Sequence, residues 1–184
     1  MARKHGDWTI KGSELKYENE FFKVREDEVI QPDGEPGAYA TVSMKPGVSV
    51  LPLDHEGFVY LTRQFRYAVG RESLEAASGG IDEGEAPLEA ARREALEELG
   101  IEADEWIDLG MIDTDTSIIS CPAHQFLARG LKFKQPQREG TEEMQTIKSG
   151  FVEAVEMVLD GRIKHAPSCV LILKAQQYLI TKKR

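Results

Sequence analysis

The stretch from Gly79 to Ile101, GGIDEGEAPLEAARREALEELGI, constrains the fold of this chain more than any other part of its sequence. Pro87 suits the first turn of a helix, and Gly100 suits the residue just past the end of one. Between them, apolar residues recur with helical spacing and form one stripe that can dock on a sheet. These residues are Leu88, Ala91, Ala95 and Leu99. The sequence therefore predicts an amphipathic helix from about residue 87 to residue 99.

The other side of this expected helix carries Glu94, Glu97 and Glu98. Glu94 and Glu98 are like charges four residues apart, and such a pair destabilises an isolated helix by about 0.2–0.5 kcal/mol. Arg93, four residues before Glu97, could offset the repulsion, and so could a bound hard cation, which takes oxygen ligands. The alternative is an ordinary solvated acidic face of the helix. The spacing of Gly79 and Glu85 ahead of these three residues weighs against it.

Seven positions of the stretch follow one pattern: Gly, five residues, Glu, seven residues, then Arg-Glu-Ala-Leu-Glu-Glu-Leu-Gly-Ile. They are Gly79, Glu85, Arg93, Glu94, Glu97, Glu98 and Gly100. The pattern resembles the Nudix box at every defined position, and a chance match of this length is rare. The resemblance implies hydrolysis of a nucleoside diphosphate linked to another group, with magnesium, or manganese, as the cofactor.

The resemblance also implies roles for the residues of the box. The implied metal ligands are the carbonyl oxygen of Ser78 and the carboxylates of Glu94, Glu97 and Glu98. The implied structural residues are Gly79, Gly100, and the pair Glu85 and Arg93, which would brace the loop against the helix.

The catalytic base is less well defined by the resemblance. Glu97 or Glu98 could orient or deprotonate the attacking water, although committed metal ligands are poorer bases. In the ADP-ribose branch of the family the base usually comes from a Glu on a late loop. Aligned through GFVEAVEMVLDGRI, that loop is EGTEEM here, which makes Glu142 or Glu143 the candidate. An exposed acidic turn is the alternative for this loop.

The run LTRQFRYAVGRESLEAASGG resembles the strand and loop ahead of the box in ADP-ribose pyrophosphatases. Arg63 and Arg66 could bind phosphates as planar forks, or could be surface cations. Their spacing of three places them on opposite faces of a strand, so one of them would meet the ligand directly. Glu75 matches a family Glu that lies near metal or substrate. Phe65 and Tyr67 could stack on a base or pack in the core.

The segment after the box departs from the pattern of ADP-ribose hydrolases. These enzymes typically carry a Pro-Gly loop there, whereas this chain has Thr116 and Ser117, with Pro122 several residues later. The departure leaves the fold and the metal chemistry in place. The substrate stays open among ADP-ribose, GDP-mannose, other nucleotide sugars and other ADP-linked metabolites. His124 could contact substrate, and the alternation of AHQFLA favours a strand residue instead.

The rest of the chain reads as strands and turns around a few helices. Residues 1–12 resemble a loose leader, and β-rich runs on both sides of the Pro/Gly turn at 32–37 predict a hairpin. A second hairpin is expected from Val48–Leu53 and Phe58–Phe65, followed by an irregular loop over 67–85. Further strands are expected at 106–112, 123–130 and 144–152, and closing helices at 153–160 and 167–181. These elements favour a mixed sheet packed between helices.

The resemblance turns this arrangement into a specific expectation. It implies an α/β fold, the Nudix α/β/α sandwich with a mixed sheet, over residues 46–184. Residues 1–45 would form a small N-terminal antiparallel β-region, which two chains of the ADP-ribose branch commonly exchange to form a homodimer.

Composition excludes several other classes of protein. The chain has 184 residues, 41% of them hydrophobic, which is enough for one well-buried core. A net charge of -9 argues against a nucleic-acid surface, which needs clustered Lys and Arg. The sequence lacks the long apolar runs of a secretory signal or a membrane span. Cys121 and Cys169 form no ligand pattern, so we expect reduced thiols and a cytoplasmic location.

The sequence thus predicts a metal-dependent pyrophosphohydrolase that acts on a small nucleotide-sugar substrate. Two alternatives remain open at this point. One is a Nudix hydrolase of dinucleoside polyphosphates or nucleoside triphosphates, against which the N-terminal β-region and the RQFRY run weigh. The other is a sensor that binds ADP-ribose or a nucleotide without hydrolysing it, against which the complete box weighs.

Overall fold

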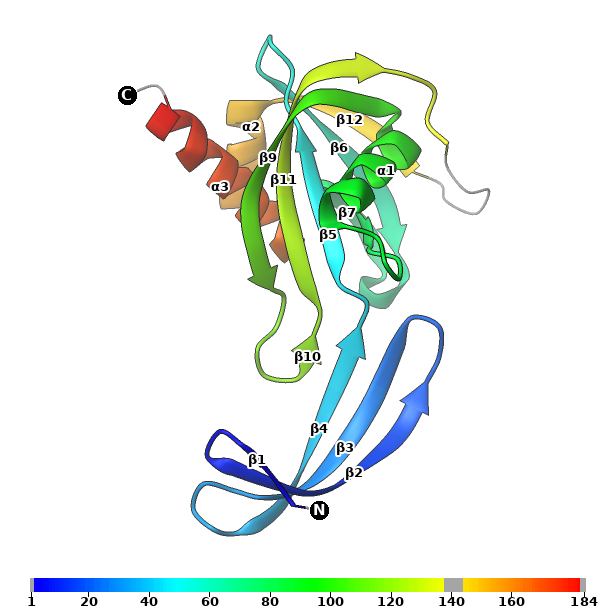
Figure 1. Cartoon of the computed structure of the whole chain (residues 1–184). Coiled ribbons are helices and arrows are strands. Elements are labelled where there is room, and N and C mark those ends of the chain that lie inside the picture. The colour runs from blue at the N-terminus through cyan, green and yellow to red at the C-terminus, as the bar shows by residue number, and fades with distance from the viewer. Residues whose placement is uncertain (1, 138–143, 183–184) are drawn as a thin grey trace. The chain divides into compact units, whose positions relative to one another are not determined.

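The computed structural model describes residues 2–137 and 144–182 (Figure 1). It divides into two compact units. The first contains the chain up to Lys45 together with Asp113–Pro122, and the second contains Pro46–Ile112 and the chain from Ala123 onward. The candidate bases Glu142 and Glu143 lie outside the described residues.

The first unit is a five-stranded sheet in the order β1-β2-β3-β4-β10. Its strands are β1 (Arg3–His5), β2 (Trp8–Glu18), β3 (Phe22–Ile30), β4 (Pro36–Met44) and β10 (Ile119–Ser120). The hairpin around the turn at 32–37 is confirmed, because β3 and β4 pair antiparallel on both sides of it. The prediction that residues 1–12 form a loose leader was wrong. Ile10 pairs with Val29, and burial of both side chains ties the first residues to the sheet.

The described residues of the second unit form two further sheets and three helices. One sheet, in the order β8-β5-β11-β9, consists of β8 (Ala77–Gly80), β5 (Gly47–Pro52), β11 (Pro122–Phe133) and β9 (Ile101–Asp113). The other, in the order β12-β6-β7, consists of β12 (Met144–Gly150), β6 (Phe58–Arg66) and β7 (Arg71–Glu75). The helices are α1 (Pro87–Leu99), α2 (Phe151–Leu159) and α3 (Ala166–Lys182).

Helices cover both faces of the four-stranded sheet. Val48 and Val50 of β5 pack with α1 in one core cluster, whereas Leu51 of the same strand packs with α2 and α3 in another. Since successive side chains of a strand point to opposite faces, the two clusters lie on opposite sides of the sheet. Strand β5 runs parallel to β11 and antiparallel to β8, so the sheet is mixed. The predicted α/β/α sandwich with a mixed sheet is confirmed.

Two local predictions were wrong. The segment 67–85 is not an irregular loop, because it contains a short 3-10 turn at Tyr67–Val69 and the strands β7 and β8. Gly79 of this segment allows β8 to pack closely against α1. Strands β5 and β6 are joined by a tight turn, but they pair only at Leu53 and Val59 and then continue in different sheets.

The helix predicted at 87–99 is α1, with the bounds expected from Pro87 and Gly100. Gly100 has a φ of 66°, and its N–H donates to the carbonyl oxygens of Ala95 and Leu96. A Cβ on this residue would also overlap the carbonyl oxygen of Lys134. Glycine at this position therefore ends the helix and allows the chain to pass closely.

We expect Gly100→Ala to lower the free energy of unfolding by about 1–2 kcal/mol, because a left-handed backbone strains any residue with a Cβ. Urea unfolding measures the difference. Gly12→Ala is the matched control, since its Cβ would meet ordinary van der Waals distances without a positive φ. Equal stability of the two variants would contradict this account of the helix end.

Candidate active site

The box helix places two carboxylates beside the end of β8. Glu94 and Glu98, one turn apart on α1, are only 8% and 7% exposed. The backbone N–H of Ser78 donates to Oε2 of Glu98 at 3.1 Å. A Cβ on Gly79 would overlap the carboxylate of Glu94, so the absence of a side chain there makes room for that carboxylate. Strand and helix together therefore form a cradle with oxygen atoms on its wall.

Arg93 braces the loop before the helix. Its Nε and Nη2 donate to the two carboxylate oxygens of Glu85, both at 3.0 Å, and Nη2 also donates to the carbonyl oxygen of Gly80 at 2.8 Å. The guanidinium lowers the pKa of Glu85. The expected Glu85–Arg93 ion pair is thus present. Arg93 additionally contacts Glu94 at 2.7 Å and Glu97 at 3.2 Å through Nη1, which offsets the repulsion along the helix.

The residues of the cradle fit a hard divalent cation, since every atom that they offer as a metal ligand is an oxygen. In residues 2–137 and 144–182 no three His, Cys, Asp or Glu side chains are placed to hold one metal ion together. The side chain of Glu97 is 40% exposed and held by Arg93. Glu94 and Glu98 are therefore the central pair of candidate ligands, and a cation that also took Glu97 would displace the contacts of Nη1 of Arg93 with Glu94 and Glu97.

A second group of polar residues includes Arg66 and Glu75. The guanidinium of Arg66 donates from Nε and Nη2 to the carboxylate of Glu75, at 3.1 and 2.6 Å. His165 lies 3.6 Å from the same carboxylate, and Ser168 lies 2.8 Å from His165. Burial alone would raise the pKa of Glu75, but Arg66, His165 and Ser73 together outweigh it, and the pKa lies below its ordinary value. The sequence did not single out His165 or Ser168, because no local motif marks them.

Arg63 lies apart from this group. It lines a hollow of about 470 Å³ with residues of β7, β12 and α2, including Leu74, Ile147 and Met157, and the lining contains no residue of α1. Leu74, its partner across the strands, packs in the core cluster of α2 and α3. The structure thus brings Arg66 and Glu75 together and does not bring Arg63 to the box.

The structure also shows the surroundings of the remaining residues that the sequence analysis singled out. Phe65 and Tyr67 are 60% and 94% exposed, so the reading that they pack in the core was wrong. His124 lies in β11 and pairs with Val48, as a strand residue does. Cys121 and Cys169 are both free thiols, and burial raises the pKa of each. No helix in the described part of the chain has the length and hydropathy needed to cross a membrane.

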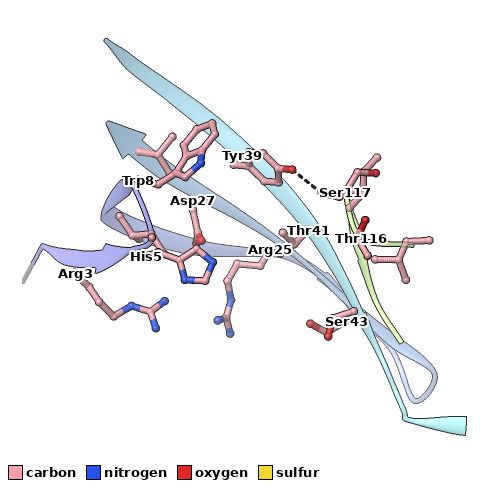
Figure 2. Close-up of a pocket in the computed structure, with 16 residues that line it drawn as sticks. Arg3, His5, Trp8, Arg25, Asp27, Tyr39, Thr41, Ser43, Thr116 and Ser117 are labelled. Carbon is pink, nitrogen blue, oxygen red and sulfur yellow. Dashed lines mark hydrogen bonds between the residues drawn. The ribbon is translucent and has the colours of Figure 1, made fainter. Parts of the chain in front are cut away.

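The first unit contains a hollow of about 590 Å³ on its sheet (Figure 2). Figure 2 shows Trp8 beside Tyr39, whose rings meet edge to face at 5.4 Å. Tyr39 donates its hydroxyl to the carbonyl oxygen of Ser117 at 2.6 Å. The segment with Thr116 and Ser117, which departs from the Pro-Gly pattern, therefore packs within the first unit.

Replacing Glu75 by Gln should lower the free energy of unfolding by about 1–2 kcal/mol near pH 7, since Arg66 loses a charged partner but stays partly solvated. The folded pKa of Glu75 is lowered, so the stabilisation is present above the unfolded pKa of about 4.3. It is lost as the pH falls through the folded pKa.

Urea unfolding of the wild type and Glu75→Gln at pH 7 and at acidic pH measures this dependence. The difference between them should shrink at acidic pH. Glu72→Gln, on the exposed side of the same strand, is the control. A difference that does not change with pH would contradict the ionic account.

Comparison with known proteins agrees with this geometry. Residues 44–166 match the NUDIX domain, and residues 8–42 match the nucleoside diphosphate sugar hydrolase N-terminal domain. The NUDIX match spans more than half of the chain and includes α1 and its carboxylates. The chain therefore belongs to the Nudix family of pyrophosphohydrolases.

Similar proteins come from several organisms. The ADP-ribose pyrophosphatase of Mycobacterium tuberculosis is 29% identical over 161 residues, which cover 85% of this chain and 77% of the relative. The methanol dehydrogenase activator of Bacillus methanolicus is 25% identical over 165 residues, which cover 90% and 85%. A crystal structure of an ADP compounds hydrolase has a TM-score of 0.83 at 20% identity and covers 98% of both chains. That likeness shows the shared fold.

Proposed function

We propose that this protein hydrolyses the pyrophosphate bond of ADP-ribose or a related nucleotide sugar, giving a nucleoside monophosphate and a sugar phosphate. The observation that carries the proposal is the cradle, in which Glu94 and Glu98 lie buried side by side against Ser78 and Gly79. The match of the first unit to a nucleoside diphosphate sugar hydrolase domain supports the choice of substrate class, as do the ADP-ribose pyrophosphatases among its relatives.

Glu94 and Glu98, with Glu97 and the carbonyl oxygen of Ser78, would hold magnesium or manganese, which lowers the pKa of bound water and neutralises phosphate charge. Residues of the chain orient these carboxylates. The N–H of Ser78 holds Glu98, and Arg93 holds Glu94.

Substrate would be held by Arg66. Its planar guanidinium can bind diphosphate oxygens as a fork, and Glu75 keeps it oriented. Arg63 lines a separate hollow without residues of α1, so the structure supports it less than Arg66 as a ligand of the diphosphate. The base that takes the proton of the attacking water is proposed to be Glu142 or Glu143, with Glu97 or Glu98 as the alternative.

Purified protein with magnesium and a panel of ADP-ribose, ADP-glucose, GDP-mannose, NADH and dinucleoside polyphosphates tests the proposal. We expect AMP and ribose 5-phosphate from ADP-ribose, or the matching products from a related nucleotide sugar. Turnover of dinucleoside polyphosphates alone would point to that Nudix activity instead. Binding of ADP-ribose without products would indicate a sensor.

We further propose that two chains assemble into a homodimer through the N-terminal β-region, and that the protein works in the cytoplasm. Large exposed apolar side chains on β2 and the turn after it, Leu15, Tyr17 and Phe21, support the first part. Free rather than paired cysteines support the second. Sedimentation at micromolar concentration tests the assembly, and a monomer there contradicts it.

A further inference from the structure

Ala76 lies where the two sheets of the second unit part. It is the one residue between β7, which ends at Glu75 in the three-stranded sheet, and β8, which begins at Ala77 in the four-stranded sheet. Ala76 is 1% exposed, so its N–H needs a partner inside the protein. That partner is Ser168 of α3, whose Oγ accepts the N–H at 2.8 Å.

The hydroxyl of Ser168 also fixes the imidazole of His165. Its Oγ lies 2.8 Å from Nδ1 of His165, and the hydroxyl can donate its hydrogen to that nitrogen while Oγ accepts the N–H of Ala76. In that arrangement Nδ1 accepts, and the hydrogen of the neutral ring lies on Nε2. Burial is the main cause that lowers the pKa of His165, which favours this neutral ring.

The same imidazole faces the ion pair of the site. Its Nδ1 lies 3.6 Å from Oε2 of Glu75, and that oxygen accepts from Nη2 of Arg66 at 2.6 Å. Glu75 and Ser168 are almost fully buried, at 2% and 0% exposed, so these contacts have little room to rearrange. The link from α3 to Arg66 runs through the backbone of Ala76. His165 bonds to Ser168, Ser168 holds the N–H of Ala76, and Ala76 directly follows Glu75, which pairs with Arg66.

We propose that His165 and Ser168 are positioning residues, which hold the backbone at Ala76 and, through it, Glu75, and thereby aim Arg66 at a diphosphate. The inference rests on the proposed function, because it assigns Arg66 the binding of that diphosphate. Since Arg66 would bind substrate and transition state alike, loss of its orientation should raise KM rather than lower kcat.

Steady-state kinetics with magnesium and ADP-ribose test the inference on the full chain. His165→Ala should raise KM about tenfold and leave kcat within about threefold. His165→Asn should restore KM to within about threefold, because its side-chain oxygen can accept the hydrogen of Ser168. His55→Ala, in the exposed turn after β5, is the matched control and should behave as the wild type.

The outcomes separate this inference from the proposed function. Suppose that the wild type turns over ADP-ribose. An unchanged KM in His165→Ala then overturns the positioning role alone, and so does a KM in His165→Asn as high as that of His165→Ala. If the wild type hydrolyses nothing, the proposed function fails. The affinity for ADP-ribose, measured by calorimetry, then decides the inference. A tenfold weaker affinity in His165→Ala supports it, and an unchanged affinity or no binding overturns it.

Discussion

Replacing Glu98 by Gln should reduce metal-dependent turnover by at least about 100-fold while the protein stays folded. Glutamine keeps the size of the side chain, and its carbonyl oxygen can still accept the N–H of Ser78 that Glu98 accepts at 3.1 Å. It removes the negative charge that strengthens the binding of a divalent cation. The contact that holds β8 to α1 should therefore survive, whereas the metal site should not.

Initial rates at saturating magnesium, with circular dichroism to verify folding, measure this effect. Glu89→Gln is the control, because Glu89 lies on the same helix, is exposed, and pairs with Arg92 rather than with the cradle. Glu89→Gln should keep nearly full activity. More than a tenth of wild-type activity in Glu98→Gln would show that Glu98 is not a metal ligand.

Gly79→Ala should have an effect of similar size on turnover, and it should also lower the free energy of unfolding by about 1–3 kcal/mol. A Cβ at this position would occupy the space of the Glu94 carboxylate. Glu94 is only 8% exposed and its carboxylate accepts from Nη1 of Arg93 at 2.7 Å, so moving that carboxylate aside disturbs this contact. The backbone at Gly79 needs no special dihedral angle here, and the requirement for glycine is one of space.

Urea unfolding and initial rates of Gly79→Ala, compared with Gly12→Ala, separate this effect from that of any added methyl group. The Cβ in Gly12→Ala would lie 3.9 Å from its nearest neighbour, so that variant should be within about 1 kcal/mol of the wild type. Wild-type rates in Gly79→Ala would contradict the cradle as described.

Much of this site could be predicted from the sequence because it lies on one helix. The spacing of Leu88 and Leu99 and the end signals at Pro87 and Gly100 fix α1, and the helix then fixes which carboxylates share a face. The fold class followed from the same box. Local patterns are sufficient wherever the chemistry is carried by residues within a few turns of each other.

The parts that were missed depend on contacts between distant segments. Strands β7 and β8 have the composition of a loop, and only their partners β6 and β5 make them strands. Ser168 follows Ala76 by 92 positions and meets it only because two sheets part at that alanine. Ile10 likewise becomes part of a core through Val29, which the sequence of the first residues does not reveal.

The central claim is that Glu94 and Glu98 hold a divalent cation at the end of β8. Calorimetric titration of magnesium and of manganese into the wild type and Glu98→Gln, each with and without AMP, tests it most directly. We expect the wild type to bind the ion with an affinity at least about tenfold higher than that of Glu98→Gln. Well-folded wild-type protein that takes up neither ion, with or without the nucleotide, would contradict it.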